Sequence, residues 1–594
     1  MKHPSYSSLG QPCRNFNILA SAVVTDPLDN REKLVLSNYA MGATGSLILI
    51  DPLTGEGESL ELPVGAGAWG LANLGDEKLV VGTCVGQAYL HVLDLRTRRW
   101  AQALAAEGEF YFWQLTVGSD GNVYGGTYPG CSLIKYDPDS HTLTNLGKVS
   151  GNAANQYSRP VWGEAPGYIL ANYGFDTTGM TAYDLKDGTF RSFGEPGEQI
   201  RWATDRLVCA EKDGALSYYN AATLLPFAGD LAKELTPRTS VALSNGQRIP
   251  VRRLVGNRLA GVRGQDYFIV PEPDGPVDSD EPVEAELKRI PVPAPATAIF
   301  TLQSDGQGRI WGASGFGQTI FRLDPASGKS WSSSSVCNAG GEVYGMQFAG
   351  GRLFLTAYVG GDHIVFDPDA PWDQLNNVNP RTLRSVAPEL IRPEGRSAIG
   401  PDGGIWTGWS AKYGTYGGGL SRIDPATLAV EGWLDPVPGQ QVAGVAADAK
   451  YVYFTTNGGA SGLAHREVQC RFGVWAPGRG LIHEETFEPE QEAGNAIVAI
   501  GGNVLIGVGD DIWIFDPDRL AFVHSVPIGH ASSWLVAIDD RIAGAYGGGQ
   551  YWEIDAASGS GVFVSEVPGY VRASVMHDGK LYFAVDSTLY VLNR

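Results

Sequence analysis

The stretch "NVYGGTYPGCSLIKYDPDSHT", residues 122–142, contains the pattern that decides the fold. A short apolar run is followed by the Gly-rich turn "GTYPG", a second apolar run and the turn "YDPDS". Asp favours tight turns because it hydrogen-bonds its own backbone, Pro because it presets φ, and Gly because it accepts positive φ. The stretch therefore predicts two antiparallel strands and a turn that leads into a third.

The same pattern recurs along the chain, in stretches that begin at Lys33, Lys78, Arg309, Arg352 and Asn503. The turn aspartates Asp51, Asp94 and Asp137 are 43 residues apart, and Asp324 and Asp367 repeat that interval. A period of about 40 to 45 residues with several strands per period is typical of β-propellers. About thirteen copies can be counted, degenerate ones included. We therefore expect an all-β fold of about thirteen four-stranded blades, arranged as two propellers of six to eight blades.

The division between the two propellers is expected near the middle of the chain. Residues 271–298, "PEPDGPVDSDEPVEAELKRIPVPAPATA", are rich in proline and acidic residues and differ most from the repeat. We place an N-terminal propeller at residues 1–285 and a C-terminal one at 286–594. The end "STLYVLNR" has the pattern of a third strand, and the start "SYSSLG" that of a fourth. The two termini can therefore share one blade, and one ring inserted within the other stays open.

Composition and charge disfavour several classes of partner. The formal net charge of the 594-residue chain is −21, which disfavours nucleic acid and an acidic membrane surface. An acidic ligand is compatible with this charge if arginines cluster locally. The six cysteines are far apart and form no CxxC pair, so we expect free, mostly buried thiols. We expect a cytoplasmic location, or a secreted or periplasmic one if a leader has been removed.

Motifs for cofactors and metals are missing from the sequence. No P-loop, GxSxG or HExxH occurs, and no His/Cys group has zinc spacing. We expect no cofactor, and a structural Ca²⁺ stays open.

The repeat assigns its loops to two faces of each propeller. Turns such as "SDGN" and "DPDS" are short and stereotyped, whereas the second-to-third turns and the connections between blades vary. Variable loops on a rigid scaffold are where ligand sites usually lie. The candidates on this variable face are Tyr128, Arg159, Tyr173, Tyr358, His363, Arg392, Arg396, Trp409, Tyr413, Tyr416 and His530.

Two histidines are candidate acids or bases. His363 stands where other copies carry the aliphatic residues Leu47, Leu90, Leu133, Ile320 and Ile512. A histidine at that position is a candidate catalyst, although a buried histidine satisfied by a neighbouring backbone group explains it as well. His530 opens a connection between blades, where exposure is expected.

The sequence resembles the β-propeller polysaccharide lyases, such as ulvan lyases and rhamnose–glucuronate lyases. The resemblance rests on the "DGNVYGGTYPG…YDP" blades, on "RPEGRSAIGPDGG" from Arg392, and on a Tyr/Arg/His face without paired acids. It covers the repeat over most of the chain, but the family's catalytic motif has no residue-by-residue match. It implies that a His or Tyr abstracts the proton α to a uronate carboxyl group, that an Arg neutralises the carboxylate, and that the 4-O group leaves by β-elimination.

The residue chemistry suggests how such a lyase would use these side chains. Arg392 and Arg396 would bind the carboxylate of an acidic carbohydrate, since Arg grips carboxylates in a bidentate way. Tyr128, Tyr413, His530 or His363 would act as base and acid, and Trp409 would stack on a sugar ring. Arg159, Tyr173, Tyr358 and Tyr416 would contact the substrate. Two alternatives are a non-enzymatic platform for a protein partner and a glycoside hydrolase on the same scaffold.

Overall fold

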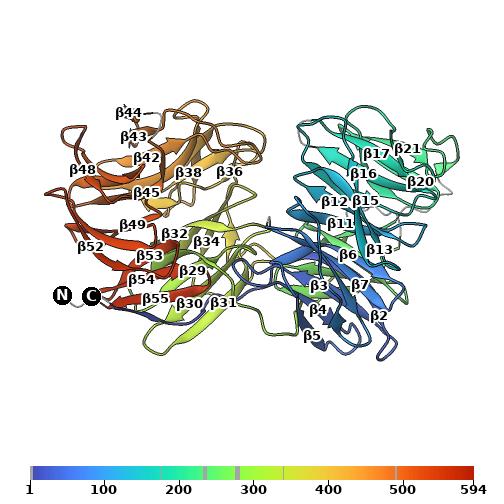
Figure 1. The fold of residues 1–594 in the computed structure, drawn as a ribbon. Helices are drawn as coiled ribbons and strands as arrows, with labels where there is room; N and C mark the ends of the chain where they lie inside the picture. Colours follow the sequence, from blue (N-terminus) through green and yellow to red (C-terminus); the bar gives the residue numbers. More distant parts are fainter. Residues whose placement is uncertain are drawn as a thin grey trace. The chain divides into compact units, whose positions relative to one another are not determined.

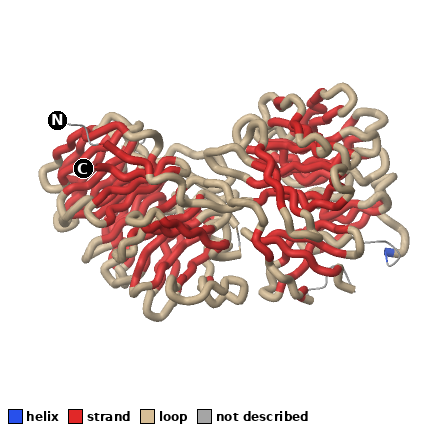
Figure 2. Tube along the Cα trace, turned by 90° about the horizontal axis from the view of Figure 1, so that it is seen from below, coloured by secondary structure: helices blue, strands red, loops and turns tan. Residues whose placement is uncertain are grey.

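The computed structural model describes residues 5–174, 177–231, 237–274, 281–338, 340–488 and 491–593. Strands joined by turns and bends account for nearly all of them (Figures 1 and 2). The chain divides into two compact units, Met1–Asn15 with Ala294–Arg594, and Phe16–Pro293. From their blades we call them the seven-bladed and the six-bladed unit. Over the described residues this gives thirteen blades and confirms the all-β propeller prediction.

The seven-bladed unit consists of antiparallel sheets that follow one another along the chain. Its strands, blade by blade, are β28 (Ile299–Ser304), β29 (Ile310–Ser314), β30 (Thr319–Asp324) and β31 (Lys329–Ser335); β32 (Val343–Ala349), β33 (Arg352–Ala357), β34 (Asp362–Phe366) and β35 (Arg381–Thr382); β36 (Leu390–Arg392), β37 (Ser397–Ile399), β38 (Ile405–Ala411), β39 (Gly418–Ile423) and β40 (Val430–Leu434); β41 (Gln441–Ala447), β42 (Val452–Asn457), β43 (Arg471–Ala476) and β44 (Gly480–Thr486); β45 (Ala493–Ile500), β46 (Asn503–Val508), β47 (Asp511–Asp516) and β48 (Ala521–Pro527); β49 (Trp534–Ala537), β50 (Ile542–Gly547), β51 (Gln550–Asp555) and β52 (Ser560–Glu566); and β53 (Val571–His577), β54 (Lys580–Val585), β55 (Thr588–Asn593) and β1 (Ser5–Ser8).

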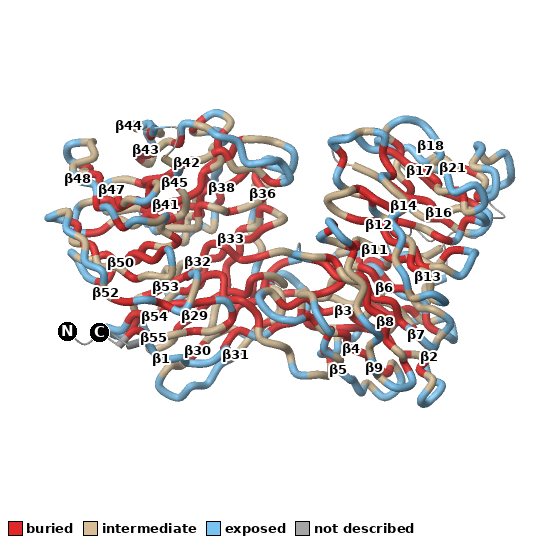
Figure 3. The backbone as a smooth tube through the Cα atoms, viewed as in Figure 1, coloured by how far each residue is buried: buried red, intermediate tan, exposed pale blue. Residues whose placement is uncertain are grey.

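The ring of the seven-bladed unit closes through its last and first blades. The innermost strand β53 contacts the innermost strand β28, and residues of both blades share one buried apolar cluster. The N-terminal strand β1 supplies the outer strand of the last blade, where it pairs antiparallel with β55 (Figure 3). A blade built from both ends of a chain holds the ring together and covers the edge of β55.

The six-bladed unit has the same construction. Its strands, blade by blade, are β2 (Ile18–Asp26), β3 (Arg31–Asn38), β4 (Ser46–Ile50) and β5 (Gly57–Glu61); β6 (Gly67–Leu74), β7 (Lys78–Cys84), β8 (Tyr89–Asp94), β9 (Arg99–Trp100) and β10 (Leu104–Ala105); β11 (Tyr111–Val117), β12 (Val123–Tyr128), β13 (Ser132–Asp137) and β14 (Thr142–Lys148); β15 (Tyr157–Trp162), β16 (Tyr168–Gly174), β17 (Gly179–Asp184) and β18 (Thr189–Ser192); β19 (Gln199–Ala203), β20 (Leu207–Lys212) and β21 (Ala215–Asn220); and β23 (Arg248–Leu254), β24 (Arg258–Arg263), β25 (Asp266–Pro271) and β27 (Lys288–Arg289), with β22 (Ser240–Leu243) and β26 (Pro282–Val283) added at the edge. Strand β2 contacts β23, so the first blade meets the last. Strand β27 lies beyond the expected boundary at residue 285 and still pairs with β25 of this unit.

The turn aspartates act as the sequence indicates. The Asp51 carboxylate accepts the backbone N–H groups of Leu53 and Thr54, and Asp137 and Asp324 bind the equivalent groups of their own turns. These Asx turns close the third and fourth strands of a blade at one face. They explain why the repeat keeps Asp at a fixed spacing.

The core of each unit lies between neighbouring blades. The middle strands are buried over most of their length, whereas outer strands and turns are exposed (Figure 3). All six cysteines are buried thiols outside any disulfide, as expected.

Candidate active site at the mouth of the seven-bladed unit

A β-bulge interrupts the pairing of the innermost strand in most blades, close to the start of that strand. In the seven-bladed unit the bulged residues include Phe300 on β28, Tyr344 on β32 and Arg572 on β53. A bulge breaks the alternation of a strand and re-aims one side chain. The starts of the innermost strands lie at the variable face, so each of these blades presents one re-aimed side chain at the mouth of the central channel.

Arg396 lies among these bulged residues. Its guanidinium carbon is 4.5 Å from the ring centre of Phe300, 5.2 Å from that of Tyr344 and 5.6 Å from that of Trp534. Its Nη1 donates to the backbone oxygens of Phe300 (3.2 Å) and Tyr344 (3.3 Å). The backbone of Arg396 has a φ of 59°, a left-handed conformation that is uncommon outside glycine and costs free energy. The fold therefore holds this arginine in place against a local preference.

Arg392 lies beside Arg396 at the same mouth. Its guanidinium carbon is 4.0 Å from the ring centre of Tyr358, and its Nη1 lies 3.4 Å from the Tyr344 hydroxyl and 3.8 Å from Glu394. The Nε groups of Arg392 and Arg396 are buried and have no acceptor among the described residues. Unfilled arginine donors beside aromatic rings suit an anionic ligand.

Two tyrosines extend the group formed by Arg392 and Arg396 toward the solvent. The hydroxyls of Tyr358 and Tyr413 are hydrogen-bonded to each other, and Tyr413 is 43% exposed. Burial, followed by the hydrogen bond with Tyr413, raises the pKa of Tyr358 above its usual range. Tyr358 therefore keeps its proton at neutral pH and can donate it toward the Tyr413 oxygen.

Glu342, directly before β32, adds a buried carboxyl group that the sequence reasoning missed. Burial raises its pKa to about 7, although the nearby guanidiniums of Arg392 and Arg396 act to lower it. One of its oxygens has no hydrogen-bond partner among the described residues. Glu394 lies within its electrostatic range and also raises the pKa. In the sequence, "GGEVYG" gives no signal of this, because a Glu beside two glycines is typical of an exposed turn.

A cavity of about 340 Å³ lies along the innermost strands of this unit. Arg396, Tyr344 and Trp534 line it together with Gln303 and Gln347. The amide of Gln303 donates to that of Gln347 (3.0 Å), which in turn donates to the Ser397 backbone oxygen (2.7 Å). Arg396 thus opens onto a space that both polar and apolar residues line.

Other sequence-predicted residues of this unit lie elsewhere. Trp409 belongs to strand β38 and is fully buried, with its indole N–H donating to Ser421 (2.7 Å). His363 is also fully buried, between the Arg384 backbone oxygen (3.1 Å) and the Ser421 hydroxyl (2.8 Å), and burial lowers its pKa to about 4. The two rings are 5.2 Å apart within the protein interior. Both side chains pack between neighbouring blades, and neither belongs to the group around Arg392 and Arg396.

Tyr416 and His530 also have partners outside the arginine cluster. The Tyr416 hydroxyl donates to the Ala464 backbone oxygen (2.8 Å), and its ring lies 4.0 Å beneath the Arg466 guanidinium. His530 Nε2 lies 3.2 Å from the Gln550 side chain. Over the described part of the chain, no hydrogen bond, ion pair or ring contact joins either residue to Arg392 or Arg396.

Tyr128, Arg159 and Tyr173 belong to the six-bladed unit. Tyr128 and Arg159 join a group of aromatic rings at the mouth of that unit, whereas the Tyr173 ring packs close to Gly179. The predicted residues therefore form two separate groups, one in each unit.

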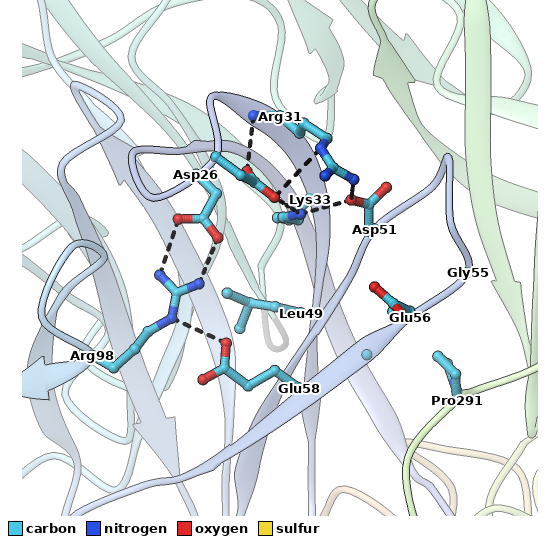
Figure 4. Close-up of a pocket in the computed structure, with 12 residues that line it drawn as sticks. Asp26, Arg31, Lys33, Leu49, Asp51, Gly55, Glu56, Glu58, Arg98 and Pro291 are labelled. Carbon is cyan, nitrogen blue, oxygen red and sulfur yellow. Dashed lines mark hydrogen bonds and ion pairs between the residues drawn. The ribbon is translucent and has the colours of Figure 1, made fainter.

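The six-bladed unit also has a charged pocket of about 680 Å³ at its stereotyped face (Figure 4). Asp51 accepts hydrogen bonds from Arg31 and Lys33 (both 2.8 Å), and Asp26 pairs with Arg98 (2.5 Å). Burial alone would raise the pKa of Asp51, but the hydrogen bonds from Lys33 and from its own turn lower it to about 2. Since each cation already pairs with a carboxylate, this network stabilises the first two blades.

No group of three or more His, Cys, Asp or Glu side chains in the described ranges could hold a metal ion. Those ranges include no helix long and apolar enough to cross a membrane.

The chain is only distantly similar to known proteins. No family model matches it, and no curated protein matches its sequence. Among solved structures, the extracellular domain of a proposed hybrid two component system from B. thetaiotaomicron is 11% identical over 99% of this chain and 82% of its own, with a TM-score of 0.30. The tricorn protease is 12% identical over 94% of this chain and 62% of its own (TM-score 0.32).

Other solved structures align with half of the chain. An inactive variant of virginiamycin B lyase from Staphylococcus aureus, with quinupristin, is 13% identical over 50% of this chain and 95% of its own (TM-score 0.40). Likenesses this distant carry no argument about function.

Proposed function

We propose that the seven-bladed unit is a carbohydrate-active enzyme that cleaves a uronate-containing glycan by β-elimination. One observation supports this most: Arg392 and Arg396 lie together among aromatic rings, each with an unfilled buried Nε donor. A uronate offers a carboxylate to such donors and a sugar ring to the aromatic faces. Two adjacent cations also stabilise the charge that develops when the α-carbon loses its proton.

The reaction needs one group that takes and returns a proton. Tyr413, as the phenolate, takes the proton from the carbon α to the carboxylate, and the C–H electron pair forms the new C=C bond. The bond from C4 to the glycosidic oxygen breaks, and Tyr413 then gives the proton to that leaving oxygen. The Tyr358 hydroxyl, hydrogen-bonded to Tyr413 and stacked with Arg392, stabilises the phenolate charge.

A glycoside hydrolase is the second candidate, favoured by a different observation. Glu342 has a pKa raised to about 7, and Glu394 lies near it and near Arg392. A carboxyl group with a raised pKa beside a second carboxyl group is a usual arrangement for the acid and base of glycoside hydrolysis.

The test incubates the protein with a panel of acidic glycans that includes ulvan and gum arabic. New ultraviolet absorbance from a C=C bond, with matching reducing ends, supports the lyase. Reducing ends without unsaturation support the hydrolase instead. Absence of both across the panel overturns the enzyme proposal, and a pull-down would then look for a protein partner.

Matched variants locate the activity. Arg392→Ala with Arg396→Ala should abolish turnover, because both carboxylate-binding groups are lost. Arg322→Ala is the control, since Arg322 also lies over aromatic rings, at 5.6 Å from Trp311 and from Trp331, but on β30. Equal loss of activity in the control would contradict the assignment.

A further inference from the structure

The mouth of the six-bladed unit contains a second group built on the same bulges. Strands β6, β11 and β15 belong to three consecutive blades, and their bulges contain Trp69, Trp113 and Arg159. The three side chains meet: Trp69 and Trp113 have ring centres 5.9 Å apart, and the Arg159 guanidinium lies 3.9 Å from the centre of the Trp113 ring. Equivalent backbone irregularities thus bring together residues from three blades.

Tyrosines surround Trp113. Its ring is stacked with Tyr111 (4.7 Å, 20°) and with Tyr157 (5.5 Å, 28°). Tyr128, in the turn "GTYPG", contacts both Tyr111 (5.6 Å) and Tyr157 (4.8 Å). We call Trp69, Tyr111, Trp113, Tyr128, Tyr157 and Arg159 the aromatic mouth.

The aromatic mouth differs from the core beneath it. Its rings are half-buried and Arg159 is exposed, whereas Phe112 and Leu115 of the same strand β11 are buried. The indole N–H of Trp113 has no acceptor among the described residues. An unfilled polar group is uncommon in a packed core and more common where a ligand binds.

We propose that the aromatic mouth binds an acidic oligosaccharide, without cleaving it. The aromatic rings offer faces and the tyrosines offer hydroxyls to a pyranose ring, while Arg159 pairs with its carboxylate or sulfate. The nearby carboxylate of Glu109 is buried and accepts the Gly130 backbone N–H (2.9 Å), so it is already used by the scaffold. The inference does not depend on the proposed activity of the seven-bladed unit.

Charge distinguishes an acidic oligosaccharide from other ligands that bind aromatic surfaces. A cationic ligand would be repelled by Arg159, which already lies over Trp113 and Tyr157. A proline-rich peptide would use the rings but would gain nothing from the arginine. Loss of binding on neutralising Arg159 is therefore diagnostic.

The experiment titrates the full chain by calorimetry with a galacturonate tetrasaccharide, with neutral maltotetraose and with a proline-rich peptide. The Arg392→Ala, Arg396→Ala background removes the arginines of the seven-bladed unit, so that the remaining binding belongs to the other unit. We expect Trp113→Ala to weaken acidic binding about 10-fold or more. Arg159→Gln should weaken it about 10-fold while leaving any binding of the neutral sugar unchanged.

Controls keep the outcome decisive. Trp100→Ala removes a half-buried tryptophan of the same unit outside the aromatic mouth and should leave binding unchanged. Arg159 is exposed, so its variant tests the site even if Trp113→Ala fails to fold. The proposal is overturned if the parent binds no acidic oligosaccharide at millimolar concentration, if Arg159→Gln binds as tightly as the parent, or if only a proline-rich peptide binds.

Discussion

At the scale of single residues, Arg396 combines a strained backbone with a functional position. Its φ of 59° favours glycine, yet the guanidinium is in contact with three aromatic rings. Strain of this kind clusters at sites where the surrounding structure fixes a residue for its function. The mouth therefore retains arginine although the local backbone prefers another residue.

Replacement of Arg396 separates these two properties. Arg396→Gly should be more stable than Arg396→Ala by about 1 kcal/mol in the free energy of unfolding, because only alanine keeps the left-handed strain. Both variants should lose glycan cleavage alike, since both lack the guanidinium. Thermal unfolding and kinetics on the same preparations check this, and activity retained by the glycine variant would refute the role of Arg396.

Glu342 should make substrate binding depend on pH. Below its pKa of about 7 the carboxyl group is neutral. Glu394 is then the nearby negative charge that offsets the positive charges of Arg392 and Arg396. Above that pH the negative charge of Glu342 competes with the substrate carboxylate, so KM should rise with pH while kcat changes less.

The matched variants are Glu342→Gln, which should show a flat KM across this range, and Glu431→Gln, which alters an exposed carboxylate on β40 and should behave as the parent. A KM profile that is the same in Glu342→Gln and in the parent would exclude this role.

At the scale of elements, the sequence predicts the features that depend on turn residues. Asp51 and Asp137 recur because the Asx turn needs them, and their spacing gives the blade count. The bulges give no such signal in the sequence. Trp113 and Tyr344 fit the alternation of a buried strand, but each is the extra residue of a bulge, which re-aims its side chain. Trp409 shows the opposite case, because "GWSAKYGTYGGG" has the composition of a loop although β38 continues through Ala411.

The charged pocket between the turns of β2 to β5 gives a prediction for acid stability. Lys33→Met leaves Asp51 with one ion-pair partner fewer and should lower the free energy of unfolding by about 2 kcal/mol at pH 7. The Asp51 pKa is lowered, so its contribution is complete above about pH 4 and is lost as the pH falls toward 2.

The difference in melting temperature between parent and variant should therefore narrow from pH 5 to pH 3. Lys450→Met, which breaks a fully exposed pair with Asp518, serves as the control and should change little at any pH. A gap between parent and Lys33→Met that is constant over this range would contradict the assignment.

At the scale of the whole molecule, the two units differ in how their rings close. The six-bladed unit is continuous in sequence, Phe16–Pro293, whereas the seven-bladed unit takes its last outer strand from the start of the chain. Loop closure by pairing the two ends couples residues far apart in sequence, so β1 carries more of the stability of its unit than its length suggests.

Removal of residues 1–8 should therefore destabilise the seven-bladed unit selectively. The deletion exposes the edge of β55 and removes the packing of Tyr6 on Phe583 (6.0 Å) and Tyr590 (5.5 Å). We expect the melting transition of that unit to fall by roughly 5 °C or more, and that of the six-bladed unit to stay unchanged. Tyr6→Ala, which keeps the backbone pairing, should cause a smaller fall. Limited proteolysis assigns each transition to its unit, and an equal loss of stability in both units, or none in either, would show that closure does not depend on β1.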